Sequence, residues 1–295
     1  MGARVRLTVL GGCGGWPTAS QPCSGYLVDH DGFRLLIDPG YAVLPRLLDH
    51  VEVGAIDAVF VSHGHPDHCA DLNPLLRARV LGAEDCAPLP VYAPAGAVDR
   101  VLDLDQVHII RRGVELVDLG DGSSESVGPF RLESVALPHH VPNLGMRLTV
   151  DDDVFVYTGD SGHCADRTAL AKDADVMLAE TSYARQAPAA DAPYLSTARQ
   201  VGETASEADV LLTLLTHLLP GEDPVDAMAV ARDGASRELQ WAAPPLQVDI
   251  SAVGAGPTPR RAMPPNAIPI SRAGRRVASY QPRRASVGGP VASLP

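Results

Sequence analysis

The stretch "AVFVSHGHPDHCADL", residues 58–72, is dense in metal-binding side chains: six positions hold His63, His65, Asp67 and His68. The apolar run 58–62 before them predicts a buried strand, and the leucine-rich run 71–82 after them predicts a helix. Side chains two positions apart in an extended turn point to the same side, so residues 63 and 65 can share one metal ion. Asp67 and His68, at the start of the helix, can face a second ion close by.

Further candidate donors stand where other predicted strands end. They are Asp160 after "VFVYTG", Glu180 after "DVMLA", His217 at the end of "VLLTLLT", and His139 and His140 after "LESVALP". Sites in sheets flanked by helices collect at the carboxyl ends of strands, so these residues can converge on one cleft. Histidine and carboxylate ligands favour zinc, with manganese or iron as alternatives. Two such ions lie about 3.5–4 Å apart in known sites, and Asp160 is the candidate bridge between them.

The predicted elements alternate in a way that favours an α/β fold. Strands are expected at 4–10, 24–30, 33–38, 58–62, 89–92, 106–110, 114–118, 130–137, 144–150, 153–157, 175–179 and 210–216. Helices are expected at 41–50, 71–82, 164–173, 196–208 and 223–233, and "HDG" (30–32) reads as a hairpin turn. A strand-rich first half followed by strand–helix alternation predicts two packed sheets with helices outside.

The charge distribution divides the chain at about residue 253. Residues 254–295 contain seven arginines and no acidic residue among many Pro, Gly, Ala and Ser, which predicts a disordered tail. The chain as a whole carries −12 and the tail +7, so residues 1–253 carry about −19. This acidity argues against a nucleic-acid binder with a broad basic surface, while a small phosphate held by metal ions remains compatible with it.

Other sequence features indicate a cytoplasmic protein. No run of about 18 apolar residues predicts a transmembrane helix, and "MGARVRLTVLGG" lacks the pattern of a secretory signal. The five cysteines are odd in number and form no C-x-x-C, which indicates reduced thiols. The glycine-rich "LGGCGGWP" (10–17) fits a dinucleotide loop poorly, because no helix pattern follows it, and is better interpreted as a tight loop near an active site.

The chain resembles the metallo-β-lactamase superfamily. "SHGHPDH" matches the H-x-H-x-D-H signature, and "LTVLGGCGG", "FRLLIDPG", "PHHVPNLGMRL", "YTGDSG" and "LLTLLTHL" follow the order of that family over residues 4 to about 250. The resemblance implies a four-layer αββα sandwich with a dinuclear metal site along one edge of the sheets. It assigns the first ion to His63, His65 and His139, with His140 as the alternative, the second ion to Asp67, His68 and His217, and the bridge to Asp160.

Within the superfamily, the chain looks most like the ribonuclease Z-like branch, some compact actinobacterial members of which are cyclic-nucleotide phosphodiesterases. One departure matters: ribonuclease Z carries a "HEAT"-like stretch whose histidine assists the leaving group, and this chain has "AETSY" there, with Ala179 in place of that histidine. No long insertion that could serve as a tRNA-gripping arm is evident either. Both features weaken the tRNA-processing hypothesis.

The sequence therefore predicts a metal-dependent hydrolase, most consistent with a phosphodiesterase. In such an enzyme a hydroxide on the metals, positioned by Asp67, attacks a small diester such as a cyclic nucleotide. A hydrolase of a thioester, lactone or other carbonyl substrate, and ribonuclease Z-like tRNA processing, are the alternatives. Glu180 is expected to support a metal ligand or to be a plain surface residue. The expected substrate contacts are Ser24, Arg147 and Ser182; the expected partner is a small diester rather than a membrane or nucleic acid, and a homodimer is left open.

Overall fold

The computed structural model describes residues 4–82, 86–105 and 109–255, whose strands form two seven-stranded sheets. The first sheet has the order β14-β1-β2-β3-β4-β5-β6. Its strands are β1 Val5–Gly11, β2 Gly25–His30, β3 Phe33–Ile37, β4 Ala58–Phe60, β5 Leu89–Pro94, β6 Val114–Leu119 and β14 Gln247–Asp249. The second sheet has the order β13-β12-β11-β10-β9-β8-β7. Its strands are β7 Ser124–Val127, β8 Phe130–Leu137, β9 Asn143–Val150, β10 Asp153–Tyr157, β11 Val176–Glu180, β12 Leu212–Thr216 and β13 Glu238–Trp241.

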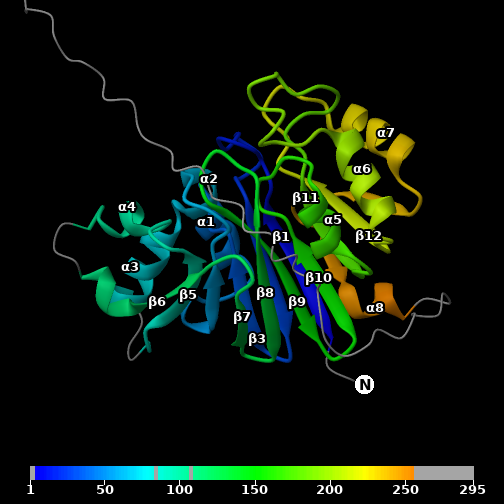
Figure 1. The fold of residues 1–295 in the computed structure, drawn as a ribbon. Coiled ribbons are helices and arrows are strands. Elements are labelled where there is room, and N and C mark those ends of the chain that lie inside the picture. The colour runs from blue at the N-terminus through cyan, green and yellow to red at the C-terminus, as the bar shows by residue number, and fades with distance from the viewer. Residues whose placement is uncertain (1–3, 83–85, 106–108, 256–295) are drawn as a thin grey trace, which may run out of the picture. The chain divides into compact units, whose positions relative to one another are not determined.

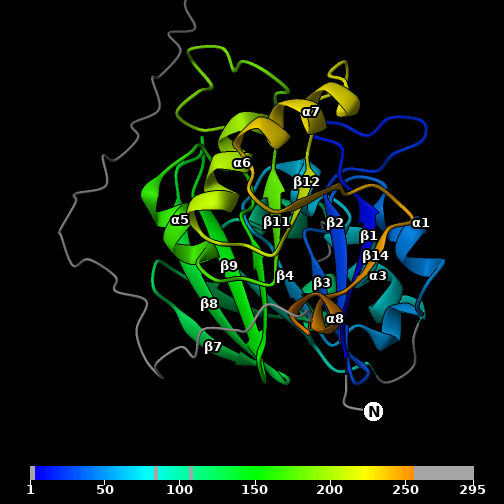
Figure 2. The same ribbon diagram turned by 90° about the vertical axis from the view of Figure 1, so that its right-hand side faces the viewer.

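Helices cover the outer faces of both sheets (Figure 1). They are α1 Val43–Leu48, α2 Pro66–Cys69, α3 Leu72–Gly82, α4 Asp99–Leu102, α5 Ala165–Ala171, α6 Ala198–Glu207, α7 Pro224–Gly234 and α8 Ile250–Gly254. Helices α1 and α3 pack on the first sheet, whereas α5, α6 and α7 lie over the second sheet, as the turned view shows (Figure 2). The predicted αββα sandwich is confirmed.

Three apolar layers hold this sandwich together. The central layer joins the facing sides of the two sheets, and each outer layer lies between one sheet and its helices. Successive side chains of a strand point to opposite faces; in β3, Leu35 and Ile37 therefore enter the central layer while Leu36 packs beneath the helices. Burial on both faces explains why these strands are continuous apolar runs.

The strand directions bring several strand ends to one edge. Strands β3, β4, β5 and β6 run parallel to one another, and so do β10, β11, β12 and β13. The predicted hairpin turn at residues 30–32 is confirmed, because β2 pairs with β3 and Asp31 and Gly32 both have positive φ, 52° and 87°. Parallel strands place their carboxyl ends together, which is where the candidate donors stand.

The structure corrects some of the predicted elements. Residues 106–108 of the strand expected at 106–110 lie outside the described residues, and Ile110–Gly113 forms a short 3-10 helix. Strands β7, β13 and β14 depart from the prediction, because each is only three or four residues long and has no run of buried residues. Within the described ranges no helix is long and apolar enough to cross a membrane. The predicted disordered tail falls almost entirely on residues 256–295, outside the described part.

We expect the start of α6 to depend on its cap. Thr197 and Gln200 form a capping box, in which the backbone N–H of Thr197 donates to Oε1 of Gln200 over 2.9 Å. Thr197→Ala should lower the free energy of unfolding by about 1 kcal/mol, measured by urea denaturation. Thr168→Ala, inside α5, is the control for loss of a threonine that caps nothing. Equal urea midpoints for Thr197→Ala and the unchanged protein would contradict the expectation.

Candidate metal centre

The seven predicted donors lie together at one edge of the sheets. They form two sets, within each of which one ligand atom per residue lies within 4.8 Å of the others: His63, His65 and His139 in the first, and Asp67, His68, Asp160 and His217 in the second. Each donor follows the end of a strand or belongs to the short helix after it. Residues more than 150 positions apart therefore meet because the topology gathers strand ends, as the sequence pattern predicts.

Asp160 lies between the two sets. Its Oδ2 is 3.3 Å from Nε2 of His217 in the second set, and its Oδ1 is 3.3 Å from Nε2 of His68. The same Oδ2 is 3.9 Å from the Nε2 atoms of both His63 and His139 in the first set. This central position suits a carboxylate shared by two cations.

A buried carboxylate behind the cluster, Asp38, fixes the orientation of two donor rings. Its Oδ2 lies 2.7 Å from Nδ1 of His68 and accepts the hydroxyl of Ser62 over 2.6 Å. Because the Ser62 proton is committed to Asp38, Oγ of Ser62 accepts from Nδ1 of His63, 3.0 Å away. Both rings are thereby protonated on Nδ1 and turn a free Nε2 toward the cluster.

The three rings of the first set turn nitrogen atoms toward one another. Too few of these nitrogens carry a proton for every contact to be a hydrogen bond. Nδ1 of His139 donates to the Tyr194 carbonyl over 3.1 Å, so its Nε2 is also a free acceptor. That Nε2 and the Nε2 of His63 lie 3.0 and 3.1 Å from Nδ1 of His65. Burial lowers the pKa of all three rings, to about 4 for His139, which keeps them neutral. Converging lone pairs of neutral rings fit a bound cation.

The second set favours positive charge. Nε2 of His68 and Nε2 of His217 lie 3.1 Å apart, and the buried Oδ1 of Asp160 makes no hydrogen bond among the described residues. Burial opposes protonation of both rings, yet the Asp160 and Asp67 carboxylates and the hydrogen bonds to carboxylates together outweigh it and raise the pKa of each ring. Burial also opposes charge on Asp67, but the His68 and His217 rings lower the pKa of Asp67 to about 2. These nitrogen and oxygen donors are ones that zinc prefers.

Comparison with known proteins agrees with this geometry. Residues 33–218, more than half of the chain, match the family model described as the β-lactamase superfamily domain. The chain belongs to the metallo-β-lactamase superfamily. Membership confirms the resemblance that "SHGHPDH" suggests and supports a metal-dependent hydrolase.

Several relatives in the superfamily are similar over most of their length. "Probable metallo-hydrolase YhfI" of Bacillus subtilis is 30% identical over 217 residues, which are 72% of this chain and 87% of YhfI. The crystal structure of YhfI matches with a TM-score of 0.76 at 27% identity, over 84% of this chain and 99% of YhfI. Ribonuclease Z of Chlamydia muridarum is 27% identical over 262 residues, covering 72% of this chain and 86% of the relative. A diphosphatase of the PhnP family shares the fold, with a TM-score of 0.65 at 19% identity over 83% of this chain and 98% of that chain.

Glu180 is a buried carboxylate that supports the opposite side of this metallo-β-lactamase site. Its Oε1 accepts the backbone N–H of Ser182 over 2.8 Å, and its Oε2 accepts those of Ser196 and Ser161 over 3.0 and 3.4 Å. Ser161 follows Asp160, and Oγ of Ser182 lies 3.2 Å from Nδ1 of His217. Burial, together with the nearby Asp160 carboxylate, raises the pKa of Glu180 to about 7. Of the two roles expected for Glu180, support of metal ligands fits its burial.

The structure places the expected substrate contacts away from the open side of the cluster. Ser24 and Ser182 are fully buried, and Ser182 contacts His217 instead. Arg147 on β9 donates to the carbonyls of Leu170 and Lys172 at the end of α5, 2.9 Å each. The sequence shows that these residues are polar, but it does not show that their side chains are buried within the protein. We therefore assign none of them to substrate binding.

The ring of His140 faces away from the two sets of donors. It packs on the ring of Tyr194 with centroids 4.5 Å apart, and its Nε2 is 3.8 Å from a carboxylate oxygen of Asp191. His139 rather than His140 thus enters the cluster.

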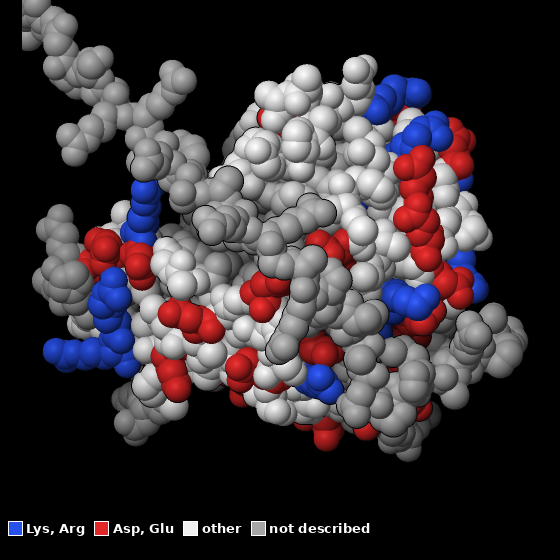
Figure 3. Space-filling view, in the orientation of Figure 1, with Lys and Arg blue, Asp and Glu red and all other residues white. Residues whose placement is uncertain are grey.

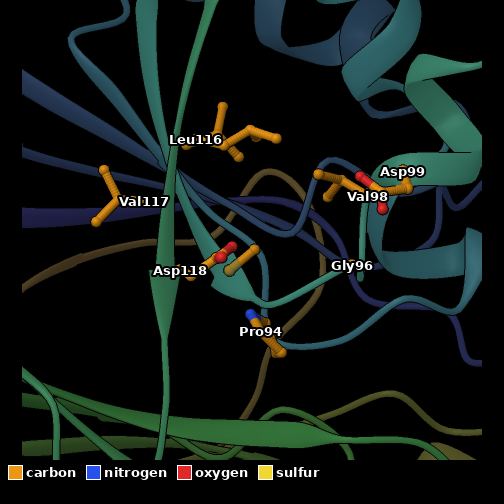
Figure 4. A pocket seen from close by; sticks show the side chains of 9 residues that line it. Pro94, Gly96, Val98, Asp99, Leu116, Val117 and Asp118 are labelled. Atoms are coloured by element: carbon orange, nitrogen blue, oxygen red, sulfur yellow. The ribbon is translucent and has the colours of Figure 1, made fainter.

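A separate cavity of about 200 Å³ lies between β5, β6 and α4 (Figure 4). Its lining combines apolar side chains such as Val91 and Leu116 with the carboxylates of Asp99 and Asp118. None of the seven donors lines it. The substrate of the metal centre is therefore to be sought over the cluster itself.

Asp38→Asn should weaken metal binding. An amide accepts on one atom only, so it cannot keep both the Ser62 N–H on Oδ1 and the Ser62 hydroxyl and His68 on Oδ2, and the donor rings lose their fixed orientation. We expect zinc affinity to fall about 10- to 100-fold, measured by competition with a chelating dye. Asp29→Asn, which removes a carboxylate paired with Arg34 on the surface of β2, is the control. Unchanged affinity in Asp38→Asn would show that the carboxylate does not orient the ligands.

His139→Ala should lower the metal content of purified protein, whereas His140→Ala should not. Only His139 points a ring nitrogen into the first set, and the two variants remove the same side chain at adjacent positions. Elemental analysis after equal zinc loading checks the expectation. Loss of metal in His140→Ala alone would reverse the assignment.

Proposed function

We propose that this protein is a hydrolase with two zinc ions that cleaves small phosphodiesters. The observation that carries the proposal is the pair of donor sets that share Asp160. His63, His65 and His139 would hold one ion, and Asp67, His68 and His217 the other. When bound, the ions supply activation of water at neutral pH and neutralise charge on the phosphate oxygens.

Asp67 is the residue that would orient the attacking water. Its side chain keeps 10% exposure, against 0% for His68 and 4% each for Asp160 and His217, so it borders the open side of the cluster. Its low pKa keeps it ionised, and an ionised carboxylate can only accept hydrogen bonds. The backbone N–H of Gly15 donates to Oδ2 over 2.8 Å and fixes that oxygen. A water held by Asp67 would therefore point its lone pair away from the carboxylate, toward the substrate.

The surroundings favour a small diester over a long polyanion. The folded part is acidic, and the face in Figure 3 shows basic side chains interspersed with acidic ones rather than a broad basic surface among the described residues. Ala179 lies in the apolar layer beneath α6, so that position supplies no proton donor to a leaving group. A small diester needs no broad basic surface, because the metal ions would neutralise its single charge. A metal ion or a water molecule would assist its leaving oxygen in place of a side-chain proton donor.

Precursor tRNA cleavage is the second candidate function. Similarity to ribonuclease Z of Chlamydia muridarum favours it, whereas the acidic body and Ala179 count against it. Carbonyl substrates such as thioesters and lactones form a third class, which the same metal chemistry could serve.

A side-by-side assay separates these functions. Zinc-loaded protein should hydrolyse bis-p-nitrophenyl phosphate and cyclic AMP, and should process precursor tRNA poorly. Removal of metal by a chelator should abolish turnover, and added zinc should restore it. Asp67→Asn should lower kcat at least 100-fold, because water orientation by a carboxylate contributes about 10²–10⁴. Efficient tRNA cleavage without diester turnover, or activity confined to thioesters or lactones, would refute the proposal.

A further inference from the structure

The loop after β1 lies directly beside the second donor set. At its base, the backbone N–H of His217 donates to the Gly12 carbonyl over 2.8 Å, and that of Gly14 donates to the Leu218 carbonyl over 3.1 Å. Gly14 must be a glycine, since an added Cβ would lie 2.6 Å from the His217 carbonyl oxygen. These contacts bind the loop firmly to the segment that carries a metal ligand.

The tip of this loop exposes a tryptophan close to the cluster. Trp16 is 57% exposed, and it follows Gly15, whose N–H contacts Oδ2 of Asp67 over 2.8 Å. With standard backbone spacing, the Cα of Trp16 then lies within about 8 Å of that oxygen. The ring of a tryptophan extends far enough from its Cα to reach a substrate bound there.

The exposure of Trp16 is unusual in this protein. Aromatic residues are only 4% of the sequence, and most of the described ones are buried or half-buried. The exposed ring of Tyr194, on the side of the first set, already packs on the ring of His140. Trp16 has no such ring partner among the described residues. Figure 2 shows the blue loop after β1 and the yellow-green loop between β11 and α6 rising at the same end of the sheets.

We propose that Trp16 is a stacking platform for a planar aromatic group of the substrate, such as a nucleobase. This inference rests on the proposed phosphodiesterase function and narrows its substrate class. A phosphate over the cluster would leave its organic substituent beside Asp67, where Trp16 offers a large apolar face that is 57% exposed. Stacking of a base on such a face is tolerant of base identity, so Trp16 would select for a planar ring rather than for one base.

The closing experiment measures binding rather than turnover. The sequence has two tryptophans, so Trp241→Phe leaves Trp16 as the only tryptophan. AMP should quench the tryptophan emission of this variant, whereas ribose 5-phosphate, which lacks the base, should not. Affinities for zinc-loaded protein are measured by titration calorimetry, which needs no tryptophan, and AMP should bind about 5- to 100-fold more tightly than ribose 5-phosphate. Trp16→Ala should erase that preference, Trp16→Phe should keep part of it, and Leu104→Ala, which removes another exposed apolar side chain, should keep all of it.

Two results in Trp16→Ala would overturn the inference, since both leave the preference for AMP unchanged: unchanged affinity for both ligands, or an equal loss of affinity for both. The first would show that the ring does not touch the base, and the second that it only supports the loop. Diester hydrolysis by the unchanged protein is measured in parallel. Its absence would count against the proposed function, while the binding preference alone decides the role of Trp16.

Discussion

The buried carboxylate of Asp38 is the interaction on which the metal centre most depends. It lies just after β3 in the first sheet, yet its Oδ2 accepts the hydroxyl of Tyr157, at the end of β10 in the second sheet, over 2.7 Å. The same oxygen holds His68 and, through Ser62, His63. A buried charge is costly unless all its hydrogen bonds are made. The two sheets must therefore pack in one relative position for these bonds to form, and that position also assembles the ligands.

Glu180 of the second sheet likewise supports candidate metal ligands through buried hydrogen bonds. Asp38 acts on donors that follow β4, whereas Glu180 fixes the backbone beside Asp160 and the serine that contacts His217. The buried Arg167 approaches the same region, where it donates to Oγ of Ser196. Two donors that follow β4, His63 and His68, are thus supported by a buried carboxylate of the first sheet, and the segments of Asp160 and His217 by one of the second sheet. Such support from behind the ligands commonly sets how tightly a metal is held.

The sequence predicts the donors much better than their supports. Four donors can be recognised in the sequence because they lie within the six residues 63–68. Asp160 and His217 can be recognised because each follows an apolar strand. Asp38 is separated from Ser62 by 24 positions, and its role follows from hydrogen bonds that only the packed sheets create. Ser24 and Arg147 are buried in the structure, which the sequence could not show, because polarity can be read from a sequence but burial of one side chain cannot. Strands β7 and β13 are missed because each is only four residues long and lacks an apolar period.

The glycine-rich stretch after β1 has a role that its sequence alone does not show, because that role depends on which residues pack against it. Its spacing fits no dinucleotide motif, and Gly14 instead permits a close approach to His217. Gly40, which follows β3, does the same for the carbonyl of Asp67, since a Cβ on Gly40 would lie 1.9 Å from that carbonyl oxygen. Any side chain at either position would push the backbone away from a candidate metal ligand. These glycines therefore contribute to the site through the close packing that they permit and not through a donor of their own.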